Sequence, residues 1–193
     1  TVSSFSIGTV TDIAGNAMSG TTVPDTNIAS GSAIVIDTTV PTITSFTSTT
    51  SNGSYKSAGT VNITATASEA VVADNTITAT LDTSDNVTLT AADNGTTLVG
   101  TYTVSAGDNS NDLTVSSFSI GTVTDIAGNA MASTTVPGTN IASGSAIVID
   151  TTAPTVSGVA ITGEDGIQNN FLNVGDNVSV TVTFSENVPV TNT

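Results

Sequence analysis

Carboxylate and amide side chains are the groups in this sequence best suited to chemistry. The 193 residues include 16 Asp and Glu and a single Lys or Arg, with neither His nor Cys. Catalytic triads that use His or Cys are therefore impossible, and imidazole or thiolate metal ligands are absent. Carboxylate and amide oxygens remain, and these are the ligands that Ca²⁺ prefers in proteins.

Three short motifs place these oxygens at recurring positions. Thr-Asp-x-Ala-Gly-Asn occupies 11–16 and 124–129, Ser-Glu occupies 68–69 and 185–186, and Asp-Thr-Thr occupies 37–39 and 150–152. Each motif follows a run of alternating apolar residues, which is typical of a strand. We therefore expect these oxygens in loops at strand ends, where functional side chains commonly lie.

Strand direction alternates in a β-sandwich, so the linker before a domain and every second loop lie at the same end. This predicts a Ca²⁺ site at the junction before the complete domain. The predicted ligands are Asp37, Glu69, Asp93, Asp125 and Asn129. Asp150 and Glu186 take the same roles at the next junction, and Asp12 and Asn16 in the preceding domain.

Turn chemistry alone is the alternative interpretation of these motifs. In that case Asp125 only caps backbone amides, and Gly128 adopts the left-handed conformation that such a turn requires. Asp37 would likewise only hold the amides of the linker.

Charge, apolar run length and the expected fold exclude several classes of function. A net charge of −15 cannot neutralise phosphates, so we expect no nucleic-acid partner. No apolar run is long enough for a membrane span in this segment. Glycoside hydrolysis by paired carboxylates needs a cleft and an acid of raised pKa, and a filled sandwich offers neither. We therefore expect that the protein is not an enzyme.

An internal repeat organises the whole chain. Residues 1–41 match residues 114–154 at an offset of 113, with four differences: Ser19/Ala132, Gly20/Ser133, Asp25/Gly138 and Val40/Ala153. A weaker match relates 61–71 to 178–188 at an offset of 117. A period of this length is too long for a solenoid repeat and suits one whole sandwich domain.

The turns set the boundaries of the predicted domains. Asp-Thr-Thr-x-Pro at 37–41 and at 150–154 ends one strand and begins another, since Pro cannot continue a central ladder. Residues 40–151 then form a complete domain with essentially no helix, and period-2 alternation predicts its seven strands at 42–47, 61–67, 76–81, 87–90, 98–104, 113–123 and 145–149. Residues 1–39 supply the last two strands (F and G) of one repeat, and 152–193 supply the first two (A and B) of the next.

These motifs together resemble the bacterial immunoglobulin-like tandem repeats of giant extracellular adhesins, found in biofilm-associated and RTX-like surface proteins. The matching stretches are 180–186, 124–129 and 149–155, with second copies at 11–16 and 36–42. The resemblance implies all-β, tandem immunoglobulin-like Greek-key β-sandwiches at the cell surface, with calcium near domain joints. It predicts a stalk or filament segment, or alternatively a module that recognises a glycan or host surface protein through loops at one domain end.

The segments at the two ends of the chain would expose unpaired strand edges if they stood alone. Their partners are expected to be neighbouring repeats of the same protein, or other copies that donate strands by β-strand addition.

Overall fold

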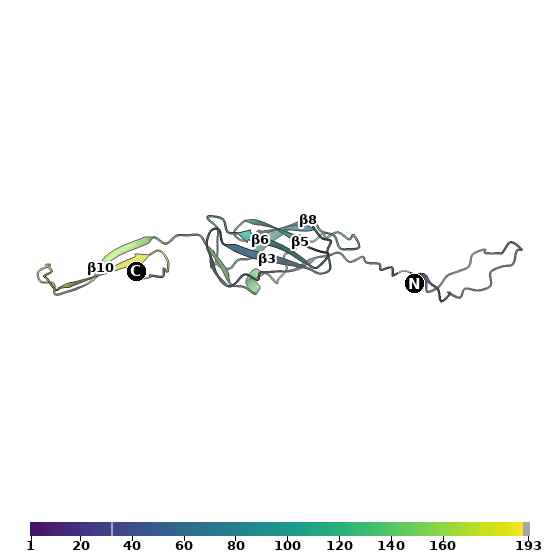
Figure 1. Cartoon of the computed structure of the whole chain (residues 1–193), viewed down its shortest axis with the longest axis horizontal. Helices are drawn as coiled ribbons and strands as arrows, with labels where there is room; N and C mark the ends of the chain where they lie inside the picture. Colours follow the sequence, from purple (N-terminus) through teal and green to yellow (C-terminus); the bar gives the residue numbers. More distant parts are fainter. Residues whose placement is uncertain (32, 191–193) are drawn as a thin grey trace.

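The computed structural model describes residues 1–31 and 33–190, and this part of the chain is mainly β-structure. A central body spans residues 43–150, and the N-terminal segment and a C-terminal hairpin extend from its opposite ends (Figure 1). Within the described residues, helix is limited to α1 (Ile28–Gly31) and the 3-10 turn η1 (Ile141–Ser143). The expected all-β class is confirmed.

The central body contains two sheets, with strand orders β1-β3-β6-β5-β4-β8 and β2-β9-β7. The strands of the larger sheet are β1 (Ile43–Thr47), β3 (Thr60–Ala67), β6 (Thr97–Thr103), β5 (Asn86–Ala91), β4 (Thr76–Leu81) and β8 (Val115–Thr122). The strands of the smaller sheet are β2 (Gly53–Tyr55), β9 (Ile147–Asp150) and β7 (Asn109–Ser110). β2 and β9 pair in parallel, and the neighbours in the larger sheet pair antiparallel.

The larger sheet curls on itself. β5 and β6 are joined only through the pairs Thr90–Val99 and Ala91–Leu98, and this short ladder lets the sheet bend between them. Phe46 on β1 and Phe118 on β8 then meet edge to face, with ring centroids 5.6 Å apart, although their strands lie at opposite edges of the sheet. The two halves of the sheet therefore enclose the core between them.

Alternation along the strands explains which side chains form that core. On β3, Val61, Ile63 and Ala65 are fully buried, while the residues between them face outward. β4 shows the same two-residue period. The buried hydrophobic cluster begins at Ile43 and ends at Ile149, so it lies inside the segment predicted as the complete domain.

The strands predicted between 40 and 151 are present as β1, β3, β4, β5, β6, β8 and β9, with their ends shifted by a few residues. Alternation did not predict β2 and β7, because runs of three and two residues are too short to show a period. Pairing between β4 and β5 joins strands that an immunoglobulin-like arrangement would place in separate sheets, so the Greek-key assignment stays a prediction. The domain boundaries likewise stay predictions.

The two flanking segments differ from each other. β10 (Val156–Asp165) and β11 (Asn177–Phe184) form an antiparallel hairpin where the first two strands of a repeat are expected. In the described part of 1–39 the expected F and G strands do not form, and a single bridge joins Thr11 to Ala17. The equivalent strands of the central body pair with β4 and β2, and no such pairing is found in the described part of residues 1–39. In the part of the chain that the structure describes, no helix is long and apolar enough to cross a membrane.

Candidate metal centre at the first junction

Asp125 lies in the loop after β8 and is held by its own turn. Its carboxylate accepts hydrogen bonds from the Asn129 backbone N–H at 2.7 Å and from the Asn129 side-chain amide at 2.7 Å. Gly128 has a φ of +96°, the left-handed conformation that the turn motif predicts. The turn therefore aims a buried carboxylate at the end of the sandwich, with Asp125 only 2% exposed.

Asp37 arrives from the linker that precedes β1. Its backbone carbonyl accepts a hydrogen bond from the Asn129 side-chain amide at 3.1 Å, so one amide group holds both Asp37 and Asp125. Its carboxylate accepts a hydrogen bond from the Thr39 backbone N–H at 3.0 Å. The linker is thus fastened to the loop after β8 across 92 residues of sequence.

Glu69 follows β3 as the second residue of a Ser-Glu pair. Ser68 ties the end of β3 to the start of β1, since its N–H donates to the Thr42 carbonyl at 2.8 Å and its hydroxyl accepts from the Thr42 N–H at 3.0 Å. Glu69 Oε1 is buried and has no hydrogen-bond partner among the described residues. An unsatisfied buried carboxylate oxygen is costly unless a donor or a cation faces it.

Asp37, Glu69 and Asp125 meet at one point, with a carboxylate oxygen of each lying within 4.8 Å of the other two. Burial raises the pKa of Glu69, and the negative charges of Asp37 and Asp125 raise it further. Burial acts to raise the pKa of Asp125 as well, but the hydrogen bonds from Asn129, Gly128 and Ala127 outweigh it and hold that pKa below its ordinary value. The cluster is therefore a concentration of negative charge with one orphaned oxygen.

These residues fit a hard divalent cation. The cluster offers carboxylate oxygens from three different loops and no sulfur or nitrogen, which is the donor set that suits Ca²⁺. Glu69, which would be one ligand, also has a buried Oε1 without a hydrogen-bond partner among the described residues. Asp37, Glu69 and Asp125 would hold the ion, and Asn129 would position two of them.

Two of the residues predicted for this junction lie outside the triad formed by Asp37, Glu69 and Asp125. Asp93 is exposed and lies outside the group of carboxylates that meet within 4.8 Å. The neighbouring residue Asn94 makes the contact from this turn to the body, since its side chain accepts a hydrogen bond from the Ala73 N–H at 2.8 Å. Asn129 lies beside the triad, and its amide group donates to Asp37 and Asp125.

The second junction repeats part of this arrangement. Asp150 accepts a hydrogen bond from the Thr152 N–H at 3.0 Å, which matches the bond between Asp37 and Thr39. Glu186 Oε1 is buried and without a partner in the described structure, as Glu69 Oε1 is, and Glu186 lines a hollow together with Asp150. A third carboxylate is not brought to this point in residues 1–31 and 33–190.

The N-terminal copy retains only the turn. Asp12 accepts hydrogen bonds from the Asn16 backbone and side chain, both at 2.8 Å, and these bonds hold the pKa of Asp12 below its ordinary value. Asp12 belongs to no group of three or more carboxylates in the described part of the chain.

The linker after β9 is anchored by a loop that the sequence did not single out. Buried Asp108 accepts hydrogen bonds from the Tyr102 hydroxyl at 2.6 Å and from the Ser105 N–H at 2.7 Å. The same loop grips Thr151, whose hydroxyl accepts from the Gly107 N–H at 3.1 Å and donates to the Asp108 carbonyl at 3.0 Å. The chain therefore leaves the central body in a defined direction.

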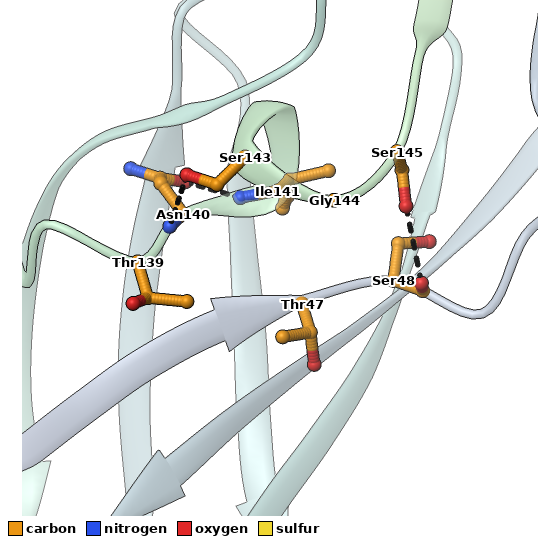
Figure 2. A pocket seen from close by; sticks show the side chains of 8 residues that line it. All are labelled: Thr47, Ser48, Thr139, Asn140, Ile141, Ser143, Gly144 and Ser145. Carbon is orange, nitrogen blue, oxygen red and sulfur yellow. Dashed lines mark hydrogen bonds between the residues drawn. The ribbon is translucent and has the colours of Figure 1, made fainter.

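The segment between β8 and β9 contains a second feature that the sequence did not reveal. Asn140 caps η1 by accepting from the Ile141 N–H at 2.8 Å, and it also bonds the N–H and carbonyl of Val115 at 3.0 and 2.9 Å. Figure 2 shows Asn140 and Ser143 in this turn, with the Ser145 hydroxyl directed to the Ser48 carbonyl at 3.3 Å. The hollow they line carries hydroxyl and amide groups and no charged side chain. The hydrogen bonds of Asn140 beside this hollow are best explained as a structural latch between η1 and β8.

Comparison of the chain with protein-family models, curated proteins and solved structures finds no match.

Proposed function

We propose that this chain is a run of immunoglobulin-like repeats from an extracellular stalk or surface filament, and that Ca²⁺ at the domain junctions stiffens the fibre. The supporting observation is that Asp37, from the linker, meets Glu69 and Asp125 of the central body within 4.8 Å. A cation held by these three residues binds the linker and the body through one centre.

The junction has two states under this proposal, one without a cation and one with Ca²⁺ bound. Without a cation the three carboxylates repel one another, and the single Lys or Arg in the sequence offers little compensation. The linker is then held to the loop after β8 by the hydrogen bond from Asn129 to the Asp37 carbonyl alone, and the neighbouring repeats swing more freely. With Ca²⁺ bound, the net interaction becomes attractive and the linker is held in place. The junction therefore acts as a calcium-dependent stiffener.

The repeated sequence fits a spacer. Residues 1–41 and 114–154 differ at only four positions, and the loops carrying Asp12 and Asp125 fold into the same hydrogen-bonded turn. Near-identical copies extend a fibre by adding equivalent units.

Thermal unfolding of the full chain with Ca²⁺ and with a chelator tests this proposal. At a hundredfold excess over its dissociation constant, Ca²⁺ stabilises the folded state by about 2.7 kcal/mol. For a body of this size the melting temperature then rises by roughly 10–20 °C. Asp37→Asn should abolish most of this rise. Asp93→Asn, which changes an exposed carboxylate outside the cluster, should leave it intact.

Small-angle scattering supplies the second measurement. The maximum dimension should be better defined and longer with Ca²⁺, because the linker at Asp37 no longer swings. If melting temperature and scattering are the same in Ca²⁺ and in chelator, the carboxylates only shape turns and the calcium proposal is wrong.

A further inference from the structure

The central body contains two Asn-Gly pairs, at 52–53 and 94–95. Such a pair is prone to lose its side-chain amide, because the glycine nitrogen can attack Cγ of the asparagine and no side chain on the glycine hinders the approach. Asn52 and Asn94 are both exposed, and each pair is followed by a hydroxyl residue. Exposure and local sequence therefore do not distinguish the two sites, and a difference in reactivity has to come from the fold.

The first pair is held by backbone hydrogen bonds. Gly53 begins β2, and its N–H donates to the Ala146 carbonyl at 3.0 Å. The Asn52 side-chain oxygen accepts a hydrogen bond from the N–H of the same Ala146 at 2.9 Å. Gly53 is also paired with Ile147 in the ladder between β2 and β9. The nitrogen that would attack is therefore occupied, and reaction at Asn52 requires β2 to separate from its neighbour.

The second pair has the same kind of side-chain contact but a different backbone. The Asn94 side-chain oxygen accepts a hydrogen bond from the Ala73 N–H at 2.8 Å, as the oxygen of Asn52 does from Ala146. A donor at this oxygen stabilises the negative charge that develops on it during attack. Gly95 lies in the turn between β5 and β6, and its N–H donates no hydrogen bond to any of the described residues. Only at this site is the attacking nitrogen unoccupied.

We propose that Asn94 is a site of spontaneous deamidation in the folded chain, that Asn52 is protected, and that the iso-aspartate product loosens the turn between β5 and β6. The Gly95 nitrogen forms a bond to Cγ of Asn94 and gives up its proton. The bond from Cγ to Nδ2 breaks, and Nδ2 leaves as ammonia. Water then opens the resulting succinimide at either carbonyl and yields aspartate or iso-aspartate. Water is the only co-reactant, and the chain gains a negative charge.

The contacts of this turn give the modification a structural effect. The Gly95 carbonyl accepts a hydrogen bond from the Val71 N–H at 2.8 Å. The next carbonyl, of Thr96, accepts from the Ala67 N–H at 2.7 Å, so the turn is bonded to the chain on both sides of Glu69. Iso-aspartate adds a carbon to the backbone at this point and displaces both carbonyls. The segment that carries Glu69 is then held less firmly. This effect does not depend on the calcium proposal, and it is tested in chelator.

Peptide mass spectrometry of the full chain, incubated with chelator in water labelled with heavy oxygen, measures both sites at once. Releasing one hydrogen bond slows a step by roughly 2- to 12-fold and Gly53 must also leave its ladder, so label should enter at Asn94 roughly tenfold faster than at Asn52. In denaturant the two rates should converge, because the local sequences are alike. Asn94→Gln should remove most of the ammonia that the folded chain releases, and the matched control Asn52→Gln should leave it unchanged.

Thermal unfolding of the purified iso-aspartate form, again in chelator, tests the effect on the turn. Loss of one hydrogen bond to the turn should lower the melting temperature by roughly 2–8 °C relative to the unmodified chain. Equal labelling of Asn52 and Asn94 in the folded chain would overturn the assignment of the site, as would a folded chain that stays unlabelled at Asn94 while the denatured chain converts. An unchanged melting temperature would overturn the effect on the turn.

Discussion

Replacing Asn140 by Ala should strongly destabilise the central body. Its side chain makes three partly buried hydrogen bonds to backbone groups, at 2.8, 2.9 and 3.0 Å, and these connect η1 to the start of β8. Each such bond contributes about 0.5–1.5 kcal/mol net. Removing all three costs about 2–3 kcal/mol, which lowers the melting temperature of a body of this size by roughly 10–20 °C.

The repeat provides a matched control for this substitution. Asn27 makes the equivalent bonds to Val2 and Ile28, at 2.7, 2.8 and 3.1 Å, but it lies in the N-terminal segment outside the buried core. Asn27→Ala should therefore leave the melting temperature of the central body unchanged in dilute solution. Calorimetry of both variants, with circular dichroism to confirm the native fold, makes the comparison. Equal losses, or no loss at Asn140, would refute the assignment of this residue as a latch between β8 and β9.

Two further predictions concern the carboxylate cluster and the core. Because the pKa of Glu69 is raised in the folded chain above its ordinary value of 4.5, its contribution to stability is present below that pH and is lost as the pH rises through the higher folded value. In chelator, the melting temperature should therefore fall as the pH rises through this interval. Glu69→Gln should make the melting temperature depend less on pH. An unchanged pH dependence in this variant would contradict the electrostatic coupling within the cluster. Ile63→Ala should cost about 2–5 kcal/mol in denaturant unfolding, because Ile63 is fully buried. The equivalent substitution Val180→Ala should cost almost nothing in dilute solution, and similar losses at both sites would disprove the separation of core from hairpin.

Sequence alone predicted β1, β3, β4, β5, β6, β8 and β9 of the central body, and it predicted that Asp37, Glu69 and Asp125 lie near one another. Alternation of Thr with Val, Ile and Ala specifies which face of a strand is buried, as on β3. Because strand direction alternates, Asp37, Glu69 and Asp125 were expected at one end of the body. In the structure, a carboxylate oxygen of each lies within 4.8 Å of the other two. Both the strands and the proximity of the three carboxylates follow from local periodicity and topology, whereas the metal site stays a prediction.

Side-chain direction could not be predicted in the same way. Asp93 lies in a loop at the expected end but outside the cluster, whereas Asn129 bonds two of its members. Asn140 and Asp108 gave no signal in the sequence, because their partners Val115 and Tyr102 are identified only when the strands have packed.

Residues 1–37 show most directly what tertiary structure decides. Nearly the same sequence forms β8 and β9 at 114–150, yet no strand forms in the described part of residues 1–37. The local preferences are the same in both places, and the difference is the presence of β4 and β2 as pairing partners. A strand is stabilised by hydrogen bonds and packing that another segment must provide, so composition and alternation determine which residues can become a strand, and the neighbours determine whether they do.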